Sequence, residues 1–413
     1  MPISVALPGA RGSAALCDED CNASIFQDVA DNHTECPPDG GYGWICVACC
    51  FAVNCFTWGV VSLTLKSFGV FLSYYLSSNI FLGSRPLDYA LIGGLNFGAA
   101  MLTAPYVTVA CRNWGLRVPM YAGTLFLGGG FIAASYATHT WHLYLSQGAL
   151  VGIGVGFVYI PTIPVLSQWF DKRRSLAHGI ATAGSGIGGL IFSLATGAMI
   201  NNLGRGWALR IIGIIVLVTN TLSTSFLRDR SAIVRPQQHP FDLALLMRWD
   251  VFFLLVWAFI SMLGYITLLY SFSDFARSIG LSAEQATQVT ALLNLGTALG
   301  RPFIGIASDR YGRFEVASGL TMLCGLCCLA IWIPTSSFGV TVLFGMISGA
   351  ILGVFWVVSG KRKGSPDLTL MHQTVGPLCV EVTGLKQQPS LLALSWLSIV
   401  LPTTCNMQPI LAF

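Results

Sequence analysis

Long apolar stretches separated by short polar connections run along most of the chain. A helix that crosses a bilayer needs about 20 apolar residues, and these stretches reach that length without the alternation typical of outer-membrane β-barrels. We therefore predict an all-α polytopic membrane protein with about 11 spans. The predicted spans are 44–76, 88–110, 117–137, 142–166, 178–200, 207–227, 251–273, 286–308, 315–334, 338–358 and 389–413.

Two polar segments divide the chain. Residues 1–43 contain seven acidic residues and one basic residue, Arg11, and this composition predicts a disordered acidic tail. Residues 228–250 contain four arginines and two prolines and are predicted to form a central loop. This loop separates an N-terminal bundle of six helices, 44–227, from a C-terminal bundle, 251–413, with five predicted helices.

The cations in the short loops predict the orientation of the chain. With a cytoplasmic N-terminus, the inside loops hold eleven Lys and Arg residues and the outside loops hold four. Cytoplasmic loops are enriched in Lys and Arg, so the tail and the central loop are predicted to be cytoplasmic. We expect an integral protein of the plasma membrane, with the lipid bilayer as a partner.

The composition narrows the function. Charged residues make up 10% of the chain, against about 25% in soluble globular proteins, so a soluble enzyme is nearly excluded. The net charge of +4 is too small to indicate a nucleic-acid partner. Most of the 13 cysteines lie in apolar runs without histidine partners, which favours buried fillers over metal ligands. The sequence shows no catalytic constellation or phosphate-binding loop, so neither an enzyme, an ATP-driven pump nor a cofactor is expected.

The loops that follow the second helix of each bundle resemble one another. Both GIASDRYGR at 305–313 and CRNWGLR at 111–117 combine cations with a glycine turn, although the first copy lacks the acid. Asp309, Arg310 and Arg313 can hold helix ends by charge pairing and by interaction with helix dipoles, which predicts a latch for alternating access. Ordinary positive-inside charge is the alternative. The repeat and the two-bundle layout resemble the major facilitator superfamily and imply its fold.

Two motifs resemble the signatures of the monocarboxylate transporter family. They are PPDGGYGW at 37–44, before the first span, and WFDKRRSLAHGIATAGS at 169–185, between the fourth and fifth spans. The resemblance runs from residue 37 to about 357 and resumes near 374, and SFGVFLSYY at 67–75 is most similar to the fungal branch.

The physical properties of both signatures favour structural and gating roles. An acid near a helix start suits the helix dipole, glycines allow close packing, and a cationic cluster anchors a cytoplasmic loop. The gating candidates are Asp39, Gly40, Gly41, Trp44, Lys172, Arg173 and Arg174, together with Asp309, Arg310 and Arg313.

Ionisable residues inside the predicted spans are candidates for substrate binding, because a charge in the bilayer is costly. Arg301, beside Pro302 in the eighth span, can bind a carboxylate through two parallel hydrogen bonds. The family resemblance implies that Arg301 corresponds to a substrate-binding arginine and Lys66 to a lysine linked to proton and anion binding. The family's acid one turn before the arginine is replaced by Thr297, which puts proton coupling through such a pair in doubt. For both cations, anchoring at the membrane interface is the alternative.

Two polar residues are further candidates for the cavity lining. Tyr159 lies beside Pro161 and Pro164, which interrupt the fourth span, and Asn294 lies in the eighth span.

One segment breaks the pattern of spans. Residues 358–373 are largely polar, and their removal would join two apolar parts of the tenth helix, so we hypothesise a retained intron of 16 codons or an error in the gene model. A genuine cytoplasmic loop is the alternative, and a transcript read across the junction distinguishes the two. We also expect that a twelfth helix is missing and that transport by the chain as written is reduced.

The resemblance and the candidate residues together predict a secondary transporter of small organic anions such as monocarboxylates. Proton coupling is open, with protons as a further partner. The alternatives are an exporter of a secondary metabolite, an importer of a non-acid such as a vitamin, and a transport-dead membrane protein or sensor.

Overall fold

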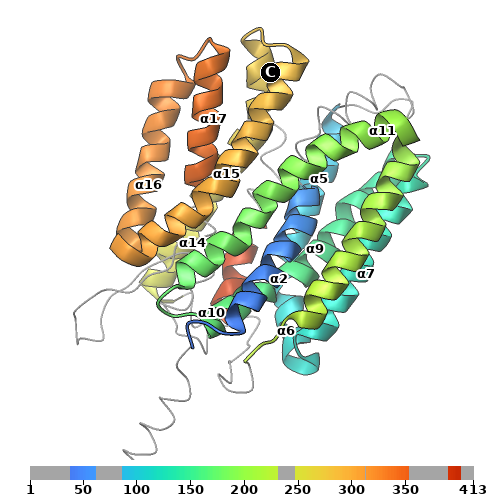
Figure 1. Ribbon diagram of the computed structural model, residues 1–413, viewed down its shortest axis with the longest axis vertical. Coiled ribbons are helices and arrows are strands. Elements are labelled where there is room, and N and C mark those ends of the chain that lie inside the picture. Colours follow the sequence, from blue (N-terminus) through green and yellow to red (C-terminus); the bar gives the residue numbers. More distant parts are fainter. Residues whose placement is uncertain (1–37, 62–85, 231–246, 312, 353–388, 401–413) are drawn as a thin grey trace, which may run out of the picture.

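The computed structural model describes residues 38–61, 86–230, 247–311, 313–352 and 389–400, and the regular structure within them is entirely helical (Figure 1). Seven of these helices are long and apolar enough to cross a membrane, or eight if one bent pair is a single span. Three shorter apolar helices lie within the remaining predicted spans: Ser318–Trp332, Phe338–Ile351 and Pro389–Ser398. The prediction of an all-α polytopic membrane protein is confirmed.

The first part of the chain forms antiparallel helices connected by short turns. A bend of 41° joins α5 to α6, and α11 folds back on itself at Gly204, whose φ is 78°. Two prolines interrupt the fourth span, because proline has no N–H to donate to the preceding turn. The helices are α2 (Gly43–Phe56), α5 (Pro86–Leu102), α6 (Ala104–Trp114), α7 (Arg117–Ser135), α8 (Thr140–Leu143), η1 (Tyr144–Leu150), α9 (Val151–Tyr159), α10 (Thr162–Trp169) and α11 (Arg174–Phe226).

The second part of the chain contains α14 (Trp249–Ser278), α15 (Ala283–Tyr311), α16 (Arg313–Cys327), η2 (Cys328–Trp332) and α17 (Phe338–Leu352). The helix α15 continues through Pro302. The predicted bundle boundary at 228–250 and the insert at 358–373 fall partly or wholly outside the described residues, so both stay predictions.

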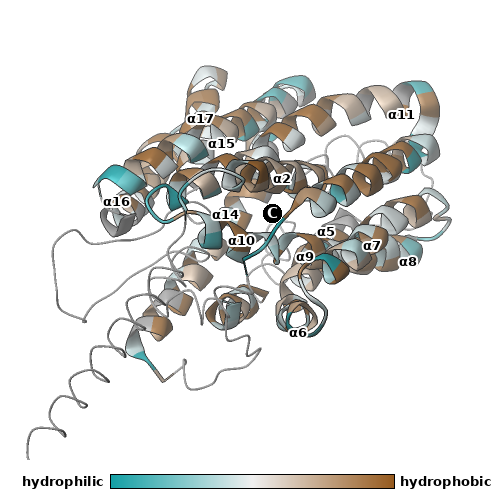
Figure 2. Ribbon diagram, turned by 60° about the horizontal axis from the view of Figure 1, so that its bottom comes forward, coloured by the Kyte–Doolittle hydropathy of each residue, from teal (hydrophilic) through white to brown (hydrophobic). Residues whose placement is uncertain are grey.

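Hydrophobic residues predominate along the helices, and hydrophilic residues are more frequent near the helix ends (Figure 2). This distribution matches a bilayer core about 30 Å thick that excludes unpaired polar groups.

The first leg of α11 packs between α2 and α15 and therefore joins the two parts of the molecule (Figure 1). Glycines allow the close approach on both sides. A Cβ atom at Gly59 would lie 2.7 Å from the Cα of Gly188, and one at Gly186 would lie 2.8 Å from the backbone nitrogen of Ala298. Larger residues at these positions would separate the helices.

Candidate functional site

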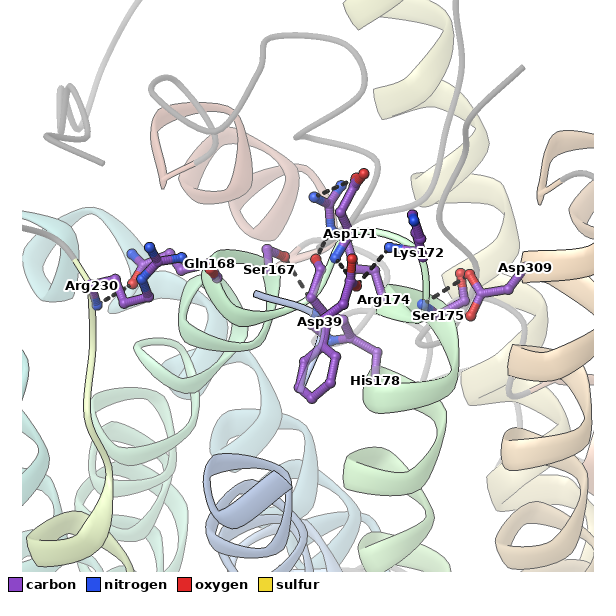
Figure 3. A network of polar contacts seen from close by, with 11 residues as sticks. Asp39, Ser167, Gln168, Asp171, Lys172, Arg174, Ser175, His178, Arg230 and Asp309 are labelled. Atoms are coloured by element: carbon purple, nitrogen blue, oxygen red, sulfur yellow. Dashed lines mark hydrogen bonds and ion pairs between the residues drawn. The ribbon is translucent and has the colours of Figure 1, made fainter. Parts of the chain in front are cut away.

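Asp39 binds the loop that precedes α11. One carboxylate oxygen of Asp39 accepts hydrogen bonds from the backbone N–H groups of Asp171, at 2.7 Å, and Lys172, at 2.8 Å, and the Asp39 N–H donates to the Trp169 carbonyl (Figure 3). The backbone of Asp39 is left-handed, with φ of 54°, which an Asp tolerates better than most residues. The two signature motifs, 132 residues apart, are thus in direct contact.

Aromatic rings close the same junction. Trp44 packs edge-on against Phe170 with ring centroids 5.0 Å apart, and Tyr42 lies 6.0 Å from Trp169. A Cβ atom at Gly43 would lie 3.0 Å from the Phe170 ring, so this position requires a glycine or a displaced ring. Residues 38–43, which the sequence places in the predicted tail, are therefore packed against the helical body.

The cations of the second signature differ in their surroundings. Arg174 is buried, donates from Nε to the Phe170 carbonyl at 2.8 Å, and pairs with Asp171 at 3.3 Å. Lys172 and Arg173 are exposed at the surface. Arg174 is therefore part of the loop structure, whereas the other two charges face outward.

Asp309, at the far end of α15, caps the start of α11. Its two carboxylate oxygens accept the N–H groups of Ser175, at 3.2 Å, and Leu176, at 2.9 Å (Figure 3). The first N–H groups of a helix lack intrahelical partners and form the positive end of its dipole, so an acid stabilises them. The predicted latch residue therefore joins α15 to α11. We call residues 169–176 the latch segment and this end of the molecule the latch end.

The cations of the two similar loops, 305–313 and 111–117, differ in their contacts. Arg310 is exposed and lies over the Tyr311 ring at 5.6 Å, and the side chain of Arg313 is outside the described set. In the first copy of the loop, Arg117 donates to the Leu227 carbonyl at 3.3 Å, within the first part of the chain. A cavity of about 340 Å³ lies nearby, lined by Arg112 among others.

Replacing Asp39 by alanine is expected to lower the free energy of unfolding by about 2–3 kcal/mol, because two hydrogen bonds to a charged acceptor are lost. Thermal unfolding of the detergent-solubilised chain measures this. The Asp39→Asn variant keeps one acceptor oxygen and tolerates the left-handed backbone, so it should lose less than half as much. Equal unfolding of wild type and both variants would show that the contact does not stabilise the loop.

Arg301 lies buried between α15 and α11, with 4% of its surface exposed. Its Nη1 donates to the Thr182 carbonyl at 2.6 Å and to the Ser185 hydroxyl at 2.7 Å, while Nε has no hydrogen-bond partner. Both acceptors belong to the second signature, a connection that the sequence does not reveal.

Two tyrosines from other helices adjoin the Arg301 guanidinium. Tyr159 of α9 and Tyr265 of α14 both lie within electrostatic range of it. Tyr159 is one of the predicted lining residues. Sequence reasoning missed Tyr265, which lies in an apolar run without a distinguishing motif.

The remaining candidates lie near Arg301 or outside the described residues. Asn294 is buried two turns before Arg301, and its side chain would lie 3.4 Å from a Cβ atom at Gly189 of α11. The Thr297 hydroxyl bonds to the Gly349 carbonyl of α17 at 3.1 Å, so this side chain contacts α17. Lys66 lies outside the described residues.

Helices that are long and apolar enough to cross a membrane, and that enclose a buried cation, define a polytopic membrane protein. Comparison with known proteins specifies the family. The Major Facilitator Superfamily model matches residues 47–359, and the chain belongs to this superfamily, whose members are transporters rather than enzymes.

Individual relatives are fungal transporters. The chain is 32% identical over 365 residues to the "Probable transporter MCH2" of Saccharomyces cerevisiae. This alignment covers 87% of this chain and 73% of that protein. It is 34% identical over 349 residues to the "Uncharacterized transporter ESBP6" of the same yeast, covering 82% of this chain but only 51% of that protein. It is also 31% identical over 353 residues to the "Fujikurins efflux protein" of Gibberella fujikuroi, covering 83% and 74%.

Proposed function

We propose that this chain is a secondary active transporter of small organic anions, such as monocarboxylates, and that Arg301 binds the anion. The observation that carries the proposal is the burial of Arg301 without a carboxylate partner among the described residues, together with its orphaned Nε–H. A buried cation without a counter-ion is costly. A substrate carboxylate would supply the missing charge and accept two parallel hydrogen bonds.

The contacts between α11 and α15 support alternating access. Arg301 joins the two helices through Thr182 and Ser185, and Asp309 joins them two turns further along. An arriving carboxylate competes with the Thr182 and Ser185 oxygens for the same guanidinium. Substrate binding would thereby weaken one of the polar connections that keep the latch end closed, and release of the Asp309 cap would open it.

We place the latch end in the cytoplasm of a cell whose plasma membrane contains the protein, because the loop cations favour that side. The signatures at 37–44 and 169–185 support membership of the monocarboxylate transporter-like group and its fungal branch. The contact between Asp39 and the latch segment supports a structural role for both signatures.

Coupling to protons is a separate question. Thr297 stands where the family has an acid, and its hydroxyl bonds to the Gly349 carbonyl of α17. We propose that any coupling proton is carried elsewhere than at this position. Similarity to the fujikurins efflux protein favours export of a secondary metabolite as the second candidate function.

Transport by the full chain in proteoliposomes tests the proposal. Radiolabelled pyruvate is expected to enter severalfold faster than into protein-free vesicles, and addition of unlabelled pyruvate inside should accelerate the exchange. Repeating the measurement with and without a pH gradient decides the coupling. The absence of uptake, exchange and efflux for every acid tested would favour a transport-dead protein or sensor.

A further inference from the structure

Four aromatic rings form a continuous chain next to Arg301. Phe97 of α5 lies 4.7 Å from Trp58, Trp58 lies 5.6 Å from Tyr159, and Tyr159 lies 6.2 Å from Trp396, all measured between ring centroids. Tyr159 and Arg301 are both buried, and the Tyr159 side chain lies within electrostatic range of the guanidinium. The ring chain and the buried cation therefore meet at one residue.

The ring chain joins helices of the first part to a helix of the predicted C-terminal bundle. Trp58, Phe97 and Tyr159 belong to helices of the first part, whereas Trp396 belongs to the helix Pro389–Ser398 near the end of the chain. Tyr159 is 3% exposed and Trp396 is 1% exposed, so their ring faces are covered in this conformation. The polar contacts of Arg301 with Thr182 and Ser185 cross between the same two parts.

In alternating access, contacts between the two parts of the molecule break when these parts move apart. When the two parts move apart, the Tyr159–Trp396 contact and the Arg301–Ser185 contact lie across the moving interface and are the ones that can open. The opened space then presents a cation, two tyrosine hydroxyl groups and uncovered aromatic faces. Aromatic pairs contribute about 0.5–1.5 kcal/mol each beyond the area they bury, so a ligand with its own ring would replace the lost ring contacts.

We propose that the preferred substrate is an organic anion with an aromatic or similarly planar body, rather than a short aliphatic acid. The anionic group binds Arg301, and the ring lies between Trp58, Tyr159 and Trp396. This inference rests on the proposed function, since it specifies the substrate class of the same site. A short aliphatic acid would satisfy the cation but leave the aromatic faces without a partner.

The test uses three 2-oxo acids with the same anionic group: phenylpyruvate, 4-methyl-2-oxopentanoate and pyruvate. The full chain is reconstituted in proteoliposomes, and transport of each acid is measured together with its effect on the thermal stability of the solubilised chain. Phenylpyruvate is expected to be favoured about 10-fold over the branched aliphatic acid, which has similar bulk but no ring. Ligand-induced stabilisation reports binding independently of transport.

Substitutions in the ring chain provide a second test of the same proposal. Trp58→Leu and Trp396→Leu should each reduce the preference for phenylpyruvate to less than about 3-fold, and Trp58→Phe should retain most of it. The control is Phe126→Leu, which removes a ring that pairs with Phe157 outside the ring chain and should leave the preference unchanged.

The outcomes separate the two proposals. Equal binding of all three acids, dependent on Arg301, would overturn the aromatic preference but preserve anion transport. A phenylpyruvate preference that is unchanged in both leucine variants would also overturn it. Binding of none of the acids would overturn the proposed function itself.

Discussion

Replacing Arg301 by alanine is expected to reduce organic-anion transport by about 100-fold or more. Each hydrogen bond to a charged group contributes about 1.5–3 kcal/mol, and a guanidinium that binds a carboxylate bidentately makes two of them. The Arg301→Lys variant keeps the positive charge but loses the paired N–H geometry, so its transport is expected to lie between those of alanine and wild type. The measurement is initial uptake of labelled acid into proteoliposomes that contain equal amounts of each protein.

The matched control for this prediction is Arg210→Ala. Arg210 is a half-buried arginine of α11, whose guanidinium lies 4.4 Å from the Tyr136 ring and donates a hydrogen bond to the Ser135 hydroxyl. Its removal should change uptake by less than about 2-fold. Because Arg301 also joins α11 to α15, thermal unfolding of each variant must show that the fold is retained. Wild-type uptake by a folded Arg301→Ala protein would exclude Arg301 as the anion-binding group.

Replacing Asp309 by alanine is expected to shift the protein towards the conformation that is open at the latch end. The two charge-assisted hydrogen bonds to Ser175 and Leu176 and the helix-dipole interaction together contribute about 2–3 kcal/mol. A difference of this size changes the ratio of the two conformations by about 30- to 150-fold. The Asp309→Asn variant retains one acceptor but no charge and should have an intermediate effect.

Spin-label distances measure this shift directly. Labels placed at the exposed residues Asn113 and Tyr311, on a cysteine-substituted background, report the separation of the two parts at the latch end. The Asp309→Ala variant should show a longer distance population that is minor in the parent. Glu284→Gln removes a carboxylate from the first turn of the same helix and should leave the distances unchanged. Identical distance distributions in parent and Asp309→Ala would exclude the cap as a latch.

The two signatures illustrate how far sequence reasoning reaches. A structural role for Asp39 follows from its place near a helix start, but its actual partners are N–H groups of a different loop. Nothing in either motif specifies that partner, because hydrogen bonds across 132 residues depend on how the helices between them pack. The latch role of Asp309 was predicted from charge and position, and only the packing of α15 on α11 identifies the helix that it caps.

The surroundings of Arg301 also contain features that the sequence predicts and features that only the tertiary structure shows. The sequence marks Arg301 because a cation in an apolar run is rare and costly. It does not mark Tyr265, since a tyrosine in an apolar run is common, nor does it show that Thr297 contacts α17. Both features depend on which helix lies beside each face of α15.

By itself, the sequence determined that this chain crosses a membrane many times, because continuous apolar runs of about 20 residues match the thickness of the bilayer core. It also determined which few polar groups need a functional explanation. The tertiary structure decided that the second signature supplies both the acceptors for Arg301 and the helix start held by Asp309. The physical reason is that helical periodicity specifies which residues share a face but not which helix that face meets.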